Sequence, residues 1–216
     1  MSIMYCNGKK SRLYSITVQK SRIYEAYALK IVRLFVYNIQ IYRPSINVSA
    51  NAGKNMIITE ANPILREIAK PVTNFGSEDL KLLIARMFDI MHEKNGVGLA
   101  APQIGVSLRI FVYGFESNKR YPDAPPVPKN IIINPEILSI SEETISLEEG
   151  CLSIPHRRGV IMRSKSIIFN TMDIEGNVHR KTVHDFEARI VQHEIDHING
   201  ILISDRASIM RDTTIT

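Results

Sequence analysis

The sequence is organised around the segment His193-Glu194-Ile195-Asp196-His197. Positions i and i+4 lie on one face of a helix, so His193 and His197 can bind one metal ion together. Glu194 can then lie beside that ion and handle the proton of the attacking water. The segment therefore predicts a helix that carries metal-dependent hydrolysis.

The helix around this segment is expected over residues 185–198, with Asp185 as its N-cap and an Asn-Gly pair at 199–200 as its stop signal. Phe186 and Ile190 precede the two histidines on the same helical face. They can form an apolar pocket beside the metal, suited to a methionine side chain. Ordinary core packing of these two residues is the alternative.

A third protein ligand is expected, because catalytic zinc-type sites use three protein ligands and leave one position for water. A metzincin would place its third His where Ile203 stands, and no Glu follows Glu194 in the chain. The carboxylates that remain downstream, Asp205 and Asp212, lie close to the terminus. The third ligand is therefore expected upstream of His193.

Cys151 is the upstream candidate. A thiolate is a good ligand for Zn(II) or Fe(II), and coordination would keep it ionised. The chain has two cysteines, Cys6 and Cys151, so a disulfide framework is not expected. The alternative for Cys151 is a small buried apolar residue.

Three segments together resemble the signatures of the peptide deformylase family. They read Gly96-Val97-Gly98-Leu99-Ala100-Ala101-Pro102-Gln103, Glu149-Gly150-Cys151-Leu152-Ser153 and Gln192-His193-Glu194-Ile195-Asp196-His197-Ile198-Asn199-Gly200. They occur in the family's order, and the segment Asn62-Pro63-Ile64-Leu65-Arg66 resembles the stretch that opens these enzymes. The resemblance extends over about residues 56–207.

The resemblance implies removal of the N-formyl group from the initiator methionine of nascent polypeptides, with release of formate. It implies one divalent metal, usually Fe(II), with Zn(II) or Ni(II) also able to occupy the site. The implied metal ligands are Cys151, His193 and His197, and the implied general base and acid is Glu194. Gln103 and the backbone N–H of Leu152 would form the oxyanion hole, and backbone groups of Val97 and Gly98 would align the peptide as an added strand.

Charged residues close to Cys151 have two interpretations each. Glu149 can form a hydrogen bond behind the metal ligands or be one of two solvated acids. Arg158 and Arg163 can orient carboxylates of the site or contact the peptide carbonyls. Solvated surface arginines are the alternative for both.

The remaining pattern predicts an α+β fold with mainly antiparallel sheets, which the resemblance places around the helix bearing the HExxH motif. A second helix is expected from a Ser77 N-cap to Asn95-Gly96, because apolar residues recur there at helical spacing. Short strands are expected at 108–113, 131–133, 166–172 and 178–183, with a hairpin turn at 173–177 before the last. Prolines crowd residues 116–130, which are expected to form a surface loop.

Residues 1–55 are expected to be a basic extension and residues 56–216 the catalytic domain. The extension holds nine Lys or Arg and one acid, Glu25, a net of +8, which leaves 18 basic and 21 acidic residues in the remainder, a net of −3. Three interpretations remain for it: an over-called reading frame that truly starts at Met56, an organellar transit peptide, and membrane association. Lys30 and Arg33 count against a spanning helix.

Two other functions remain open at this point: a metalloprotease of the HExxH type, and a non-catalytic metal-binding module closed by His156 as fourth ligand. For the deformylase we expect nascent formyl-Met polypeptides as partners, transient ribosome contact, no specific nucleic acid, no membrane and a monomeric state. We expect a cytoplasmic location in a bacterium. A mitochondrion or plastid is the alternative if residues 1–55 are a transit peptide.

Overall fold

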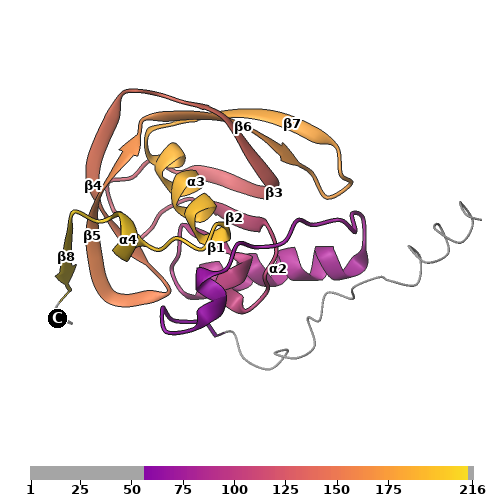
Figure 1. The fold of residues 1–216 in the computed structure, drawn as a ribbon, viewed down its shortest axis with the longest axis horizontal. Helices are drawn as coiled ribbons and strands as arrows, with labels where there is room; N and C mark the ends of the chain where they lie inside the picture. Colours follow the sequence, from indigo (N-terminus) through magenta and orange to yellow (C-terminus); the bar gives the residue numbers. More distant parts are fainter. Residues whose placement is uncertain (1–55, 214–216) are drawn as a thin grey trace, which may run out of the picture. The chain divides into compact units, whose positions relative to one another are not determined.

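The computed structural model describes residues 56–213, and the predictions for residues 1–55, including Cys6, lie outside this range. Two antiparallel sheets and two long helices form the fold (Figure 1). The helical elements are η2 (Pro63–Arg66), α2 (Glu78–Glu93), η3 (Ala101–Ile104), α3 (Asp185–Ile198) and α4 (Ile203–Arg206). None of the helices within 56–213 is long and apolar enough to cross a membrane.

The first sheet has the strand order β1-β2-β3-β6-β7, and the second has the order β4-β5-β8. Their bounds are β1 (Gly98–Ala100), β2 (Ile110–Phe115), β3 (Val127–Ile140), β6 (Ser166–Met172) and β7 (Val178–His184) in the first sheet. The second sheet contains β4 (Thr144–Cys151), β5 (Ile154–Ser164) and β8 (Ile209–Asp212). All these strand pairs are antiparallel, which confirms the predicted α+β class.

The five-stranded sheet separates α2 from α3. On β2, Phe111 and Tyr113 pack in the cluster that includes the apolar face of α3, whereas Ile110 and Val112 pack with the face of α2. Alternate residues of a strand face opposite sides of its sheet, so a strand covered on both sides is apolar at nearly every position. α3 also contacts β5, so it is held between the two sheets (Figure 1).

The helix boundaries agree closely with the predictions, except at the start of α3. The Ser77 side chain accepts a hydrogen bond from the backbone N–H of Leu80, as an N-cap does. α3 ends at Ile198, with Asn199 as its C-cap and Gly200, with φ of 75°, directly after it. Its N-cap is His184, however, and Asp185 is the first helical residue with φ of 47°, so the predicted cap was one residue late.

The predicted strands are present, and the hairpin turn before β7 is confirmed by Asp173, which accepts hydrogen bonds from the backbone N–H groups of Glu175 and Asn177. The loop prediction for 116–130 was wrong at its end, because β3 begins at Val127. Asn118 in this loop is buried and donates to the carbonyl of Asn95. Pro126 and Pro128 are compatible with a strand at this point, because residues there need to form backbone hydrogen bonds on only one side of the strand.

Candidate active site

The three predicted metal ligands meet where α3 passes the end of β4. His193 and His197 lie one helical turn apart, and Cys151 is the last residue of β4. Cys151 Sγ is 3.2 Å from His197 Nε2, and the three ligand atoms all lie within 4.8 Å of one another. Elements far apart in the sequence therefore bring one thiol and two imidazoles to a single point.

The donors fit a divalent metal ion such as Zn(II) or Fe(II), which accept sulfur and imidazole ligands. Burial alone would raise the pKa of the Cys151 thiol, but the charge of His197 and hydrogen bonds from both histidines hold that pKa well below its usual range. His193 Nδ1 is 2.9 Å from a Glu149 carboxylate oxygen, which leaves its Nε2 for a metal. The lowered pKa of Cys151 and the orientation of the His193 ring both favour binding of a cation at this point.

His156, the proposed fourth ligand, does not lie in this group. Its side chain is exposed on β5, and among residues 56–213 the group holds only the three ligands Cys151, His193 and His197. A closed four-ligand structural site is therefore contradicted. Three protein ligands with one position left open is the arrangement of catalytic sites.

Glu194 is 3% exposed, and its Oε2 has no hydrogen-bond partner among the described residues. Burial raises its pKa to about 7, although the charges of His193 and His197 act in the opposite direction. A carboxyl group that titrates near neutrality can both accept and donate a proton. Gly98 contributes to this placement, because a Cβ at position 98 would collide with the Glu194 carboxylate.

The side-chain amide of Gln103 is held in a fixed orientation. Its Oε1 accepts from the backbone N–H of Ala100 at 2.9 Å, and its Nε2 donates to Ser153 Oγ at 3.1 Å while lying 3.7 Å from Cys151 Sγ. Gln103 is 1% exposed, so its amide is buried beside Cys151. Leu152 follows Cys151 in the short turn to β5 and lines the same cavity.

Val97 and Gly98 stand at the edge of the five-stranded sheet and line the cavity. Gly98 pairs with Tyr113 of β2, and within residues 56–213 no strand pairs with the other edge of β1. Phe186 and Ile190 line the cavity from α3, and Ile190 is also buried in the core between α3 and the sheet. The pair therefore lines a cavity beside the predicted ligands, and its role in binding a methionine side chain stays a prediction.

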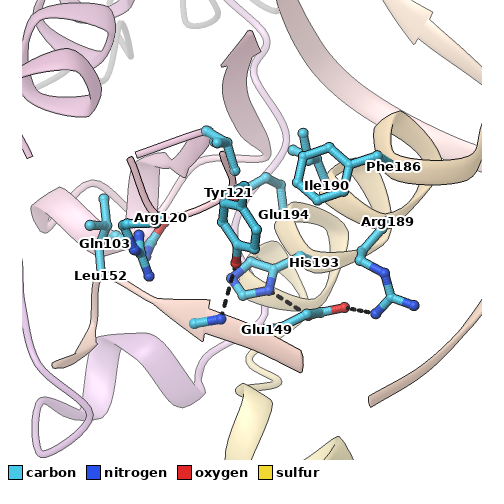
Figure 2. A pocket seen from close by; sticks show the side chains of 13 residues that line it. Gln103, Arg120, Tyr121, Glu149, Leu152, Phe186, Arg189, Ile190, His193 and Glu194 are labelled. Carbon is cyan, nitrogen blue, oxygen red and sulfur yellow. Dashed lines mark hydrogen bonds and ion pairs between the residues drawn. The ribbon is translucent and has the colours of Figure 1, made fainter. Parts of the chain in front are cut away.

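Glu149 is buried behind the ligands and is not a solvated acid. It accepts hydrogen bonds from Arg163 Nε at 2.9 Å and from Arg189 Nη1 at 2.6 Å, in addition to its contact with His193. Figure 2 shows the contacts with Arg189 and His193. These partners hold the pKa of Glu149 well below its usual range against the opposing effect of burial. Arg163 also pairs with Asp196 of α3, so it orients two carboxylates of the site.

Arg158 does not reach the site carboxylates. It pairs with Glu148 and lies with its guanidinium 5.0 Å from the ring centroid of Tyr121. Tyr121 in turn packs on Phe186 with ring centroids 5.1 Å apart, and its hydroxyl accepts from the backbone N–H of Gly150 (Figure 2). Tyr121, Gly150 and Phe186 line the cavity, whose volume is about 30 Å³.

The cavity is also lined by Arg120, Tyr121 and Arg189, which were not among the predicted site residues. Arg120 and Tyr121 belong to the proline-rich stretch, which carries no local signal for a return to the site. For Arg189 a signal existed: it precedes His193 by four residues and so shares its helical face. A buried arginine on that face indicates a buried carboxylate partner.

Residues 54–212 match the family described as polypeptide deformylase. Peptide deformylase 2 of Ralstonia nicotianae is 47% identical over 138 residues, which cover 64% of this chain and 78% of the relative. Peptide deformylase 1 of Bordetella pertussis is 44% identical over 158 residues, which cover 73% of this chain and 88% of the relative.

Similar folds occur among solved structures. The Met-Ala-Ser-bound crystal structure of the class I type b peptide deformylase from Acinetobacter baumannii is 41% identical with a TM-score of 0.67, and the match covers 69% of this chain and 96% of that one. The peptide deformylase structure from Thermotoga maritima is 44% identical with a TM-score of 0.64, covering 71% of this chain and 97% of that one.

Proposed function

This chain belongs to the polypeptide deformylase family, and from that premise we propose how its own residues carry out the family's reaction. The chain is a hydrolase that removes the N-formyl group from newly synthesised polypeptides. It uses a single divalent metal ion. The roles of individual residues and the identity of the ion are the proposed part.

Cys151, His193 and His197 would hold the ion. When bound, the ion supplies Lewis acidity, which lowers the pKa of water towards neutrality and polarises a carbonyl. We propose Fe(II) as the resident ion, with Zn(II) or Ni(II) as alternatives, because the sulfur and imidazole donors suit all three. Glu149 fixes the His193 ring through Nδ1, so the ligand atom keeps its direction.

Glu194 moves the proton. Its free, buried Oε2 can accept a proton from the water that attacks the formyl carbon. The same carboxylic acid can then give that proton to the amine nitrogen as the C–N bond breaks, releasing formate and the free amino terminus. A pKa of about 7 matches both directions of transfer at neutral pH.

Gln103 and the backbone N–H of Leu152 are proposed to stabilise the charge that develops on the formyl oxygen. Gln103 already has its Nε2 near Cys151 and its Oε1 fixed by Ala100, so no reorientation is needed during the reaction. Preorganised donors of this kind typically contribute a few kcal/mol each to transition-state stabilisation.

The peptide itself is proposed to add to the free edge of β1 at Val97 and Gly98. An added strand uses the backbone hydrogen bonds that an edge strand leaves unpaired. The methionine side chain would then point to Phe186 and Ile190 on α3, which line the same cavity. Tyr121 lines the same cavity.

The observation that carries the proposal is the convergence of three ligands with the unpaired Glu194 carboxylate. The test is formate release from formyl-Met-Ala-Ser by the metal-loaded enzyme, compared with Glu194→Ala and Cys151→Ser. We expect formate release to fall by about 10²–10⁴-fold in Glu194→Ala with its bound metal retained. Cys151→Ser is expected to lose metal and activity together.

Full activity in Glu194→Ala would overturn the proposed mechanism. Exposed Glu78 on α2 provides the control, since Glu78→Ala leaves the site untouched. Cleavage of unformylated peptides at internal bonds would instead favour a protease.

We also propose a bacterial cytoplasmic location, a monomeric state and transient contact with the ribosome, where nascent chains emerge. The relatives from Ralstonia nicotianae and Bordetella pertussis support the bacterial context. The acid-poor, basic composition of residues 1–55 supports the alternative of a mitochondrion or plastid. Fractionation of the source cells and sedimentation of the purified enzyme with and without ribosomes distinguish these proposals.

A further inference from the structure

Arg189 of α3 is a buried arginine with three acceptors around its guanidinium. It is 4% exposed, and its Nη1 donates to the Glu149 carboxylate at 2.6 Å and to the carbonyl of Ile161 at 3.1 Å. Its Nη2 donates to the carbonyl of Ile145 at 2.6 Å. One side chain of α3 therefore binds the main chain of both β4 and β5 as well as a carboxylate of β4.

The Glu149 carboxylate is bound by two side chains of the same helix. Arg189 and His193 are four residues apart, so they lie on one face of α3. Arg189 Nη1 binds Glu149 Oε1, whereas His193 Nδ1 lies 2.9 Å from Glu149 Oε2 (Figure 2). Each oxygen of the carboxylate therefore contacts a different turn of α3. Arg189, Glu149 and His193 together are called the α3–β4 clamp below.

The α3–β4 clamp joins the two elements that supply the predicted metal ligands. Glu149 precedes Cys151 by two residues on β4, and His193 is itself a predicted ligand on α3. His197 follows one helical turn after His193. A fixed contact between Glu149 and α3 consequently fixes where the thiol lies relative to the two imidazoles.

Arg163 binds the same carboxylate in a different way. It approaches from β5 and donates to both oxygens of Glu149, at 2.9 and 3.0 Å. β5 is already paired with β4, so this contact orders Glu149 within its own sheet. The link from Arg163 to α3 passes through Asp196 instead. Among residues 56–213, Arg189 and His193 are the side chains of α3 that contact Glu149 directly.

We propose that Arg189 is a positioning residue for metal binding. Through Glu149 it sets the orientation of the His193 ring and the spacing between His193 and Cys151. The carbonyls of Ile145 and Ile161 hold the guanidinium in place for this purpose. The inference rests on the metal site of the proposed function and adds to that site a residue that is not itself a ligand.

The test measures the Zn(II) dissociation constant of the full chain by competition with a chelator, under conditions in which circular dichroism shows the protein to be folded. Residues that orient a metal ligand typically contribute about 10–100-fold in affinity. Arg189 acts on His193 through one further residue, so Arg189→Met is expected to raise Kd about tenfold. Arg189→Lys, which retains a positive charge beside Glu149, is expected to recover most of this loss.

Arg109→Met is the matched control. Arg109 is a half-buried arginine that also connects the end of α3 to a sheet, because it donates to the Asn199 side chain at 2.8 Å and to the carbonyl of Pro135. Its partners do not include Glu149, so we expect lower stability with an unchanged Kd for Zn(II). A rise of Kd in Arg109→Met equal to that in Arg189→Met would overturn the proposal.

A double-mutant cycle with Glu149→Gln separates positioning from a merely structural effect. In the Glu149→Gln background, Arg189→Met is expected to change Kd by less than about twofold, because the carboxylate through which Arg189 acts has been removed. A tenfold rise in this background would overturn the proposal, and so would an unchanged Kd in Arg189→Met alone. Arg189→Gln, which keeps an amide donor for the two carbonyls, replaces Arg189→Met in the cycle if the latter does not fold.

Zn(II) binding is measured without substrate, so the proposed function and the α3–β4 clamp can fail separately. Absence of formate release by the metal-loaded, unsubstituted enzyme would overturn the proposed function. A Kd that does not respond to Arg189→Met would overturn the clamp, even in an enzyme that releases formate.

Discussion

Position 98 requires glycine for a steric reason that the neighbouring residues in the sequence do not indicate. The Glu194 carboxylate occupies the space that a Cβ at position 98 would need. This close approach places the carboxylate against the edge of β1, where the peptide is proposed to add. The absence of a side chain at position 98 therefore allows Glu194, the proposed proton-transfer residue, to lie against the edge of β1 where the peptide is proposed to bind.

Gly98→Ala is predicted to reduce formate release by about 10²-fold while leaving the fold intact, because displacement of a catalytic group by about 1 Å costs that much. The measurement is kcat/KM with formyl-Met-Ala-Ser alongside a thermal unfolding curve. Gly76→Ala is the control, which is expected to affect stability and not activity. Its Cβ meets no atom within 4 Å, but its φ is 66°, so we expect lower stability with unchanged activity. Wild-type activity in Gly98→Ala would contradict the close approach.

At the scale of elements, β5 ties β4 to α3 through one buried arginine. Arg163 is 5% exposed and binds Glu149 of β4 and Asp196 of α3. Arg206 of α4 pairs with the same Asp196, so four elements meet through opposite charges. Charge attraction from these carboxylates raises the pKa of Arg163 above its usual value, although burial opposes it. His193 is therefore oriented by a network that joins the three-stranded sheet to α3 and α4.

Arg163→Met is predicted to lower the free energy of unfolding by about 3–5 kcal/mol, because it removes one positively charged partner from each of two buried carboxylates, Glu149 and Asp196. Denaturant titration measures this loss. Arg157→Met is the matched control on the same strand. Its side chain is 40% exposed and pairs at 3.4 Å with an exposed Asp212, so the expected change is below about 1 kcal/mol. Equal effects of the two substitutions would refute the role assigned to the buried network.

At the scale of the whole described chain, the ligands come from separate layers. Cys151 belongs to the three-stranded sheet, and the two histidines belong to the helix that packs on the five-stranded sheet. A bound ion would therefore cross-link the two sheets through α3. Ligands that bind only the folded state stabilise it in proportion to the logarithm of their excess over Kd.

Removal of the metal by a chelator is predicted to lower Tm by about 10 °C, given a metal concentration of about 1,000 times Kd. Calorimetry before and after chelation measures the shift. Readdition of Fe(II), Zn(II) or Ni(II) in separate samples should restore Tm in each case, and the relative formate-release rates then rank the ions. An unchanged Tm after verified metal loss would show that the ion does not join the sheets.

A variant that begins at Met56 is predicted to keep both fold and activity, because every residue assigned to the site lies within 56–213. Circular dichroism and formate release from formyl-Met-Ala-Ser measure the two properties. Loss of either property would assign residues 1–55 a structural role. Retention of fold and activity would agree with a separate extension, whether residues 1–55 are an over-called reading frame or a transit peptide.

Local patterns predicted much of the fold. The apolar stripe of α2 and the boundaries of α3 follow from helical periodicity, and β6 and β7 follow from runs of strand-forming residues around an Asp-Ile-Glu-Gly-Asn turn. β4 and β5 were not predicted, although they carry Cys151, Glu149 and Arg163. Their charged and exposed positions weaken the alternation that a strand needs in order to be recognised.

The sequence by itself predicted metal-dependent hydrolysis, because the HExxH spacing and the upstream Cys151 are local patterns with direct chemical meaning, and the resemblance of three segments to a family narrowed this prediction to deformylation. Only the tertiary structure decided that Glu149 is buried between two arginines, that His156 lies away from the predicted metal ligands, and that Tyr121 lines the cavity. These facts depend on contacts between residues 14 to 44 positions apart, as in the Glu149–Arg163 and Glu149–His193 pairs. No local periodicity encodes such contacts, since they arise only when the sheets and α3 pack together.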